Sequence, residues 1–200
     1  QSVWKFERIS KKFTFLAADG ASTGGYSAIF PKPAYQDGVK GIKGNQRSVP
    51  DLVLSGGFLG GTATVNVKGN KIVITGKLGP SPNFWECFDS GLASGNGVAA
   101  GYECATTGGT SIVPPQYAGI FAIVAQKSGE RQGLINPKLY AMAKANLKKP
   151  GAVGLIDITS GNNAVAPVRG ISAGKGFDAA SGWGSLDISQ FVNSFISFTP

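Results

Sequence analysis

A glycine-rich run that leads into an apolar segment constrains the fold of this chain most. Residues 108–115 read Gly-Gly-Thr-Ser-Ile-Val-Pro-Pro, and residues 117–125 are apolar almost throughout. Glycines permit a tight backbone and the close approach of a ligand, and prolines suit the first turn of a helix. The pattern predicts a buried helix that begins just after Ser111, with backbone N–H groups that favour negative charge near its hydroxyl. The alternative is that Thr110 or Ser111 only caps the helix.

Other motifs accompany this run in a fixed order along the chain. They are Thr-Gly-Gly-Tyr-Ser at 23–27, Phe-Pro-Lys-Pro-Ala-Tyr-Gln at 30–36, Arg-Ser-Val-Pro-Asp at 47–51, Asp-Ile-Thr-Ser-Gly-Asn at 157–162, Ala-Gly-Lys-Gly-Phe-Asp at 173–178 and Ser-Gly-Trp-Gly-Ser at 181–185. Together they resemble the C-terminal part of the catalytic domain of sedolisins, which are serine-carboxyl peptidases. The resemblance covers most of the chain except roughly residues 55–105, which we interpret as a divergent hairpin and a cysteine-containing excursion.

The resemblance implies an α/β fold. Sedolisins have a subtilisin-like three-layer α/β/α architecture with a parallel sheet, and residues 1–200 would supply its later strands and helices. Such a sheet needs helices on both faces, and a partial one leaves strand edges and apolar helix faces exposed. We therefore expect an N-terminal chain of the same precursor to complete the domain.

The resemblance also assigns a catalytic serine. Ser111 would be the nucleophile, and the substrate-binding residues would be Gly24, Gly25, Gly109 and Thr110. A serine hydroxyl needs a base to take its proton, and the chain contains no histidine, which excludes a Ser-His-Asp triad within it. In sedolisins a glutamate supported by an aspartate is the base and another aspartate aids the oxyanion, so activity at acid pH is implied. In sedolisins all three acidic residues lie N-terminal to the part of the catalytic domain that this chain resembles.

The expected activity is therefore that of the nucleophile-bearing chain of a secreted, acid-acting endopeptidase, inactive without its N-terminal partner chain. Its substrate would be a peptide or protein. Glu86, Asp89 and Glu103 precede Ser111 closely, but solvation is the commoner fate of such carboxylates, and we do not assign the base to them. Two other possibilities stay open: a non-catalytic, calcium-stabilised binding or structural domain, and a proteolytic fragment without activity.

A calcium site is expected within residues 157–178. By resemblance, Asp157 and Asp178 would give carboxylates, and Ile158, Gly174 and Gly176 would give backbone carbonyls. Calcium takes six to eight oxygen ligands in flexible geometry, which suits this donor set. The alternative is an Asp-capped turn in a glycine-rich loop.

Cys87 and Cys104 are the only cysteines. A disulfide between them would close a loop of roughly 15 residues and stabilise the fold by about 3 kcal/mol in the chain-entropy model. Such bonds persist outside the cytosol, which fits an extracellular location. Two free thiols are the alternative, and zinc is not expected from two cysteines without histidine.

Composition limits other partners. The chain is 42% hydrophobic with a net charge of +8. Its apolar runs are too short for a membrane span, and its basic residues are dispersed without a nucleic-acid motif, so neither a membrane span nor nucleic-acid binding is expected. The N-terminus lacks the apolar region of a signal peptide, so we expect any signal and pro-segment to lie outside this chain.

Local patterns predict several elements. We expect strands at 13–17 and 49–55, a β-hairpin at 62–75 that turns at Gly69-Asn70, and loops over 76–107. Two further helices are expected, one from Asn136-Pro137 to about residue 148 and one from Ser185 to about Ile196.

Overall fold

The computed structural model describes residues 5–6, 20–56, 63–67, 70–74, 84–89, 102–107, 109–165 and 167–199. Contacts divide the chain into two compact units. The first unit combines Gln1–Leu54 with Val113–Pro200, and the second is Ser55–Ile112.

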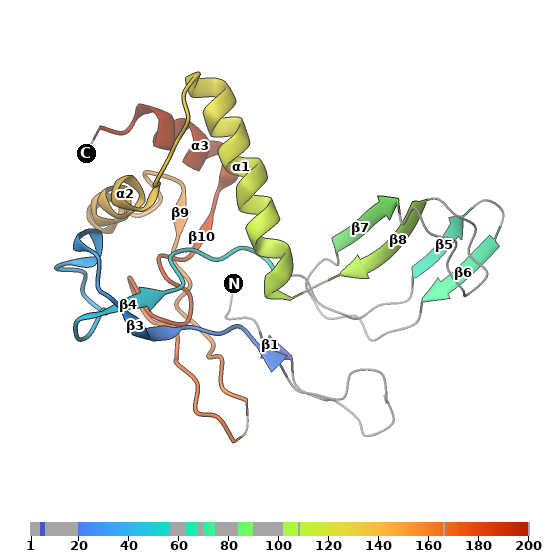
Figure 1. The fold of residues 1–200 in the computed structure, drawn as a ribbon, viewed down its shortest axis with the longest axis horizontal. Helices are drawn as coiled ribbons and strands as arrows, with labels where there is room; N and C mark the ends of the chain where they lie inside the picture. Colours follow the sequence, from blue (N-terminus) through green and yellow to red (C-terminus); the bar gives the residue numbers. More distant parts are fainter. Residues whose placement is uncertain are drawn as a thin grey trace. The chain divides into compact units, whose positions relative to one another are not determined.

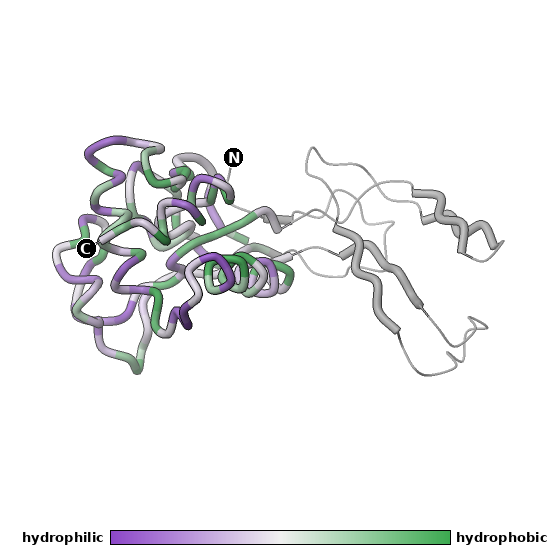
Figure 2. The backbone as a smooth tube through the Cα atoms, turned by 90° about the horizontal axis from the view of Figure 1, so that it is seen from above, coloured by the Kyte–Doolittle hydropathy of each residue, from purple (hydrophilic) through white to green (hydrophobic). Residues whose placement is uncertain are grey.

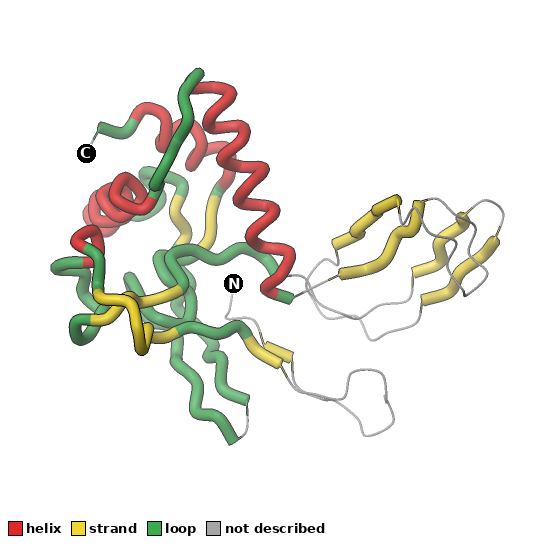
Figure 3. Tube along the Cα trace, in the orientation of Figure 1, coloured by secondary structure: helices red, strands yellow, loops and turns green. Residues whose placement is uncertain are grey.

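Three helices form the body of the first unit (Figure 1). They are α1 (Val113–Ser128), α2 (Asn136–Lys148) and α3 (Ile188–Ser197). Short strands and a single 3-10 turn are linked by long loops (Figure 3): β1 (Lys5–Phe6), β2 (Gly20–Ala21), β3 (Gly25–Pro31), η1 (Ala34–Gln36), β4 (Gln46–Val49), β9 (Leu155–Ile156) and β10 (Ser185–Leu186).

Aromatic side chains hold the helices together. Phe121 of α1 meets Phe191 and Phe195 of α3 edge-on, with ring centroids 6.1 and 5.3 Å apart. Phe191 and Phe195 are almost completely buried, and burial of one such side chain stabilises the fold by about 1.5–3 kcal/mol. The packing of α1 on α3 is therefore the main apolar contact between helices.

The helix ends follow the sequence signals closely. Pro137 lies in the first turn of α2, where its missing N–H costs nothing. Asp187 caps α3 by accepting a 3.0 Å hydrogen bond from the Gln190 N–H, an interaction worth about 1 kcal/mol. Both predicted helices are confirmed, although the second starts at Ile188 because Ser185–Leu186 forms β10.

The first helix, α1, is only partly covered. Apolar residues occur on several of its turns (Figure 2), but Ile120 and Val124 are buried while Ile123 is 44% exposed. The sequence predicted a buried helix at this position, and the described residues cover one side of it. None of the helices in the described ranges is both long and apolar enough to cross a membrane.

All strand pairs that the structure describes are antiparallel and two-stranded. The expected parallel sheet is therefore not present among these strands. β3 and β4 pair antiparallel and are connected by residues 32–45, which include η1. β9 and β10 have two residues each and pair only with one another among the described strands. The expected strand at 49–55 is also wrong beyond Val49, because Pro50 cannot donate to a ladder.

The second unit contains two hairpins. β5 (Ala63–Val67) pairs with β6 (Asn70–Ile74), which confirms the hairpin expected at 62–75. β7 (Phe84–Asp89) pairs with β8 (Tyr102–Thr107) in a region that was expected to form loops. The 3-10 turn η2 (Thr110–Ile112) ends the unit. The strand expected at 13–17 lies outside the described residues.

Candidate functional site

Ser111 lies in η2, directly before α1 in the sequence. Its side chain and that of Thr110 are exposed. Gly109 precedes the turn with φ +95°, a conformation that glycine adopts without strain. The Gly109 N–H donates a 2.5 Å hydrogen bond to the carbonyl of Gly56, which closes the second unit at its base. The serine is thus exposed and follows a residue that is hydrogen-bonded to Gly56.

The helix-cap alternative fits the geometry less well. A capping residue lies just outside the helical segment with extended backbone. Ser111 is the middle residue of η2, and Ile112 is the residue directly before α1. Neither Thr110 nor Ser111 therefore occupies the position that precedes the helical stretch.

Gly24 and Gly25, the other substrate-binding candidates, lie in the first unit at the start of β3. A Cβ atom on Gly24 would lie 1.8 Å from the carbonyl oxygen of Ala179, so only glycine fits there. Gly25 pairs with Val49 of β4, and its φ of +142° also favours glycine. Gly24 therefore lets the chain at the start of β3 pack closely against the loop that follows Asp178.

Asp157 and Asp178 contact the same glycine loop from two sides. Oδ2 of Asp157 accepts a 2.8 Å hydrogen bond from the Gly176 N–H, and Oδ2 of Asp178 accepts one of 2.9 Å from the Gly174 N–H. Oδ1 of Asp178 accepts hydrogen bonds from the N–H groups of Ala180 and Ser181.

Ser181 connects this loop to Ile158. Its hydroxyl lies 3.0 Å from Oδ1 of Asp178 and 3.4 Å from the carbonyl oxygen of Ile158. The structure therefore brings all five expected calcium ligands into one hydrogen-bonded neighbourhood. In the described part of the chain no three acidic, cysteine or histidine side chains gather to bind a metal, so backbone carbonyls would have to complete the donor set. Carboxylate and carbonyl oxygens are the ligands that calcium takes, and in this respect the residues fit the ion.

A buried polar network lies beside these loops. Gln36 is fully buried, and its Nε2 donates to the Ser48 carbonyl and the Tyr140 hydroxyl at 2.8 and 2.7 Å. Tyr140 donates in turn to Oδ1 of Asp51 at 2.7 Å. Arg47 forms an ion pair with Oδ2 of Asp51. The network joins η1, β4 and α2.

The network changes how its members titrate. Burial raises the pKa of Tyr140 well above its ordinary value, and the nearby charge of Asp51 adds to the effect. Burial opposes the charge of Arg47, yet the hydrogen bond and charge of Asp51 outweigh it and raise the pKa of the guanidinium. Arg47 therefore stays charged and Tyr140 stays neutral over the physiological range.

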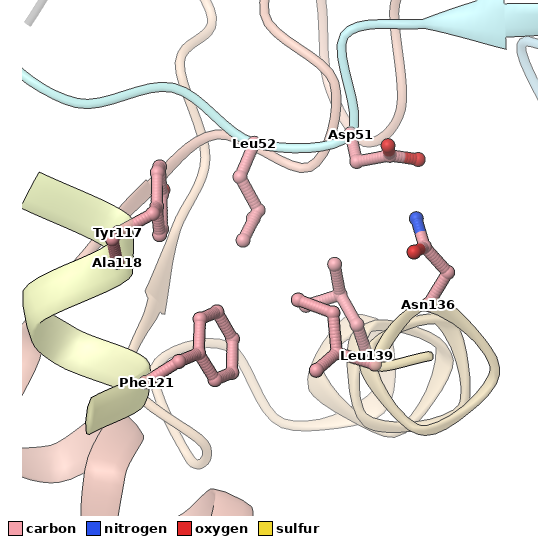
Figure 4. A pocket seen from close by; sticks show the side chains of 8 residues that line it. Asp51, Leu52, Tyr117, Ala118, Phe121, Asn136 and Leu139 are labelled. Atoms are coloured by element: carbon pink, nitrogen blue, oxygen red, sulfur yellow. The ribbon is translucent and has the colours of Figure 1, made fainter. Parts of the chain in front are cut away.

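An apolar pocket of about 300 Å³ opens next to Asp51 (Figure 4). Tyr117 and Phe121 of α1 line one side, Leu139 and Asn136 of α2 line the other, and Leu52 lies above them. The Tyr117 hydroxyl donates a 3.1 Å hydrogen bond to the Val53 carbonyl, and burial raises the pKa of Tyr117. The pocket therefore lies between α1 and α2.

Comparisons with known proteins bear on this site. Kumamolisin from Bacillus sp. (strain MN-32) is 33% identical over 169 residues, which are 84% of this chain and 24% of kumamolisin. Sedolisin from Pseudomonas sp. (strain 101) is 26% identical over 170 residues, which are 85% of this chain and 22% of sedolisin. The chain is homologous to the sedolisin family of serine-carboxyl peptidases. No family model matches it.

The sedolisin fold is also shown by a solved structure. Pseudomonas sedolisin, a serine-carboxyl proteinase complexed with two molecules of pseudo-iodotyrostatin, superposes with a TM-score of 0.57 and 22% identity, covering 96% of this chain and 40% of that one. This chain spans about a quarter of the length of the sedolisin relatives it matches in sequence. The homology thus confirms the resemblance that the motifs indicated.

Sequence reasoning missed most of the polar network in this sedolisin homologue. Asp51 ends the Arg-Ser-Val-Pro-Asp motif, and the structure shows it bonded to Tyr140 and Arg47. The four-residue spacing of Arg47 and Asp51 was a usable signal for their ion pair. Gln36 and Tyr140 gave no comparable signal, because their positions along the chain differ by 104.

Proposed function

We propose that this chain carries the nucleophile, Ser111, of a secreted serine-carboxyl endopeptidase that acts at acid pH. The single observation that carries the proposal is the exposed Ser111 in a glycine-led turn, in a chain homologous to sedolisins. The cysteine pair expected in the second unit is consistent with an oxidising, extracellular compartment.

In the proposed reaction the Ser111 oxygen attacks the peptide carbonyl carbon. Its proton passes to a glutamate outside this chain, and the carbonyl oxygen becomes an oxyanion. Collapse of this intermediate breaks the C–N bond, the amine leaves with the proton, and water then hydrolyses the acyl group. The backbone N–H of Thr110 is suited to stabilise negative charge, whereas that of Gly109 is bonded to the Gly56 carbonyl. One such donor contributes about 2.7–4 kcal/mol in known cases.

On the substrate side, we propose that Gly24 and Gly25 line the cleft. A peptide chain can approach glycine backbone closely because no side chain intervenes. Glycine at position 24 also has a structural role, because it allows the start of β3 to pack against Ala179 in the loop after Asp178.

We further propose that an N-terminal chain of the same precursor completes the domain. Its support is the uncovered apolar surface of the first unit. Ile29 and Phe30 of β3 are 81% and 67% exposed, and the pocket between α1 and α2 is lined mainly by apolar side chains. The partner would supply the glutamate, its supporting aspartate and the oxyanion aspartate.

Calcium binding is proposed for the loop of Asp157 and Asp178, with carbonyls from Ile158, Gly174 and Gly176. A bound ion would hold two segments of the loop together against carboxylate repulsion. The approach of both carboxylates to the same glycine loop supports this proposal. The N–H groups of Gly174 and Gly176 donate to the Oδ2 atoms of Asp178 and Asp157.

The decisive experiment replaces Ser111 with Ala in the assembled protein and measures peptide hydrolysis at acid pH with a mixed peptide pool. We expect a loss of at least about 10³-fold in turnover, because the nucleophile acts as one unit with its base. Ser189→Ala, an exposed serine on α3, is the matched control and should retain activity. Equal turnover by the Ser111→Ala protein would reject the nucleophile role. An assembled wild-type protein without hydrolysis would favour the non-catalytic, calcium-stabilised domain.

A further inference from the structure

The two cysteines lie in register across one β ladder. β7 and β8 pair continuously from Phe84↔Thr107 to Asp89↔Tyr102, and Cys87 is directly opposite Cys104. Directly opposite residues of an antiparallel pair have Cα atoms about 4.5–5.5 Å apart and share a face of the ribbon. Disulfides join Cα atoms about 4.4–6.8 Å apart.

From this register we propose that Cys87 and Cys104 form a cross-strand disulfide that clasps the hairpin leading into Ser111. The part concerning Ser111 rests on the proposed peptidase function, whereas the disulfide itself does not. The disulfide would be a covalent modification that positions the segment before Ser111. Both cysteines lie within roughly residues 55–105, the part of the chain that does not resemble sedolisins.

The register makes the pairing specific to these positions. Neighbouring residues of a strand alternate between the two faces, so the flanking pairs Glu86↔Ala105 and Phe88↔Glu103 belong to the opposite face. A shift of one residue in either strand would move one cysteine to that face. The six consecutive pairs of the ladder fix the register that places the cysteines together.

The position of the clasp links it to the candidate nucleophile. β8 ends at Thr107, and the chain then passes through Gly109 into the turn that holds Ser111. The Gly109 N–H is bonded to the Gly56 carbonyl. Local opening of the hairpin would release the segment on one side of this bond, and a covalent cross-link opposes such opening.

The oxidation is balanced by thiol–disulfide exchange. The two thiols lose two protons and two electrons as the S–S bond forms, and a small disulfide such as oxidised glutathione takes them up and leaves as two thiols. An oxidising compartment supplies an oxidant of this class.

The first test counts thiols in the wild-type chain. Denatured protein is treated with N-ethylmaleimide before and after reduction with a phosphine, and intact mass is measured. We expect no adduct before reduction and adducts on both cysteines afterwards. Full labelling before reduction would overturn the disulfide.

Peptide mapping then identifies the bond. Trypsin leaves both cysteines in one peptide, because neither lysine nor arginine occurs between Lys77 and Lys127. Cleavage at Asp89 by an aspartate-specific protease separates Cys87 from Cys104. We expect the two fragments to remain joined until reduction, and separate fragments without a reductant would contradict the proposal.

A register-shifted variant provides the matched control. Cys104→Ser combined with Glu103→Cys keeps two cysteines but places the second opposite Phe88, on the other face. Under the denaturing conditions of the first test, both cysteines of this protein should be labelled by maleimide without reduction. Equally efficient disulfide formation in this variant would overturn the argument from register.

Hydrogen exchange tests the link to Ser111. Reduction of the wild type, or a Cys87→Ser, Cys104→Ser double variant, should speed amide exchange at residues 109–111 by roughly tenfold or more. Unchanged exchange there would overturn the positioning role even if the disulfide is present. These readouts do not depend on peptide hydrolysis, so failure of the clasp and failure of the proposed peptidase function can be told apart.

Discussion

Tyr140 on α2 donates a 2.7 Å hydrogen bond to the carboxylate of Asp51, a residue 89 positions earlier in the chain. The same hydroxyl accepts a 2.7 Å bond from Gln36, and Asp51 is paired with Arg47. Asp51 also accepts a backbone hydrogen bond from Trp183, in the segment after the candidate calcium loop. The contact thus connects α2 to the loops that hold both Gly24 and Asp178.

Replacing Tyr140 with Phe removes both hydrogen bonds of the hydroxyl. Tyr140 is 1% exposed, so its loss leaves the buried hydrogen-bond partners of the hydroxyl unsatisfied. We therefore expect the free energy of unfolding to fall by about 1–3 kcal/mol. Urea denaturation measures it. Tyr26→Phe is the control, since Tyr26 is 41% exposed and water can replace its bond to the Gly41 carbonyl. Equal losses in the two variants would refute a special role for the network.

Alkaline pH should destabilise the first unit. The pKa of Tyr140 and that of Tyr117 are raised in the folded state, so the stability gained from their neutral forms is complete below about pH 10 and is lost as the pH rises through the folded values. Absorbance titration of the phenolates alongside circular dichroism measures this. We expect both tyrosines to ionise together with unfolding; ionisation near pH 10 without loss of structure would show that they are not buried.

Gly24→Ala should be destabilising. Its Cβ would lie 1.8 Å from the Ala179 carbonyl oxygen, so β3 or the loop must move, at a cost of about 1–3 kcal/mol. Gly119→Ala on α1 is the control, because a Cβ there meets nothing within 4 Å and alanine favours helix by up to about 1 kcal/mol. The midpoint of thermal unfolding should fall for Gly24→Ala and rise for Gly119→Ala. A stable Gly24→Ala protein would mean that β3 is not packed on this loop.

Calcium should raise the midpoint of thermal unfolding, and a chelator should lower it. At 100 times the dissociation constant, binding to the folded state alone adds about 2.7 kcal/mol. Asp157→Asn should abolish the shift, whereas Asp37→Asn should keep it, since Asp37 is exposed and pairs with Lys32 elsewhere. A midpoint that changes with neither calcium nor chelator would contradict the calcium site and favour an Asp-capped turn.

Sequence patterns predicted elements best where local signals were complete. Asn136-Pro137 marks the start of α2, and alternating residues mark the β5–β6 hairpin. The β7–β8 hairpin was missed although Asn96-Gly97 is a tight-turn signal, because the connection over residues 90–101 is far longer than a two-residue turn. Pairing of that kind depends on tertiary contacts, which local propensity does not record.

Ordered motifs predicted Ser111, Gly24, Gly25 and the carboxylates of the candidate calcium loop as site residues, and their roles stay predictions. The structure brings Asp157, Gly176 and Asp178 into one neighbourhood. The partners of Asp51 could not be derived, since Gln36 and Tyr140 meet only after η1 and α2 have packed together.

We propose that this chain is one part of a larger peptidase fold. The mass of protein from its natural source, measured under native and then denaturing conditions, tests this proposal. We expect the 20.5 kDa sequence to occur with further polypeptide, joined to it or separable on denaturation, whose sequence carries the glutamate and aspartates of a serine-carboxyl peptidase. A lone 20.5 kDa monomer that unfolds cooperatively would contradict the account.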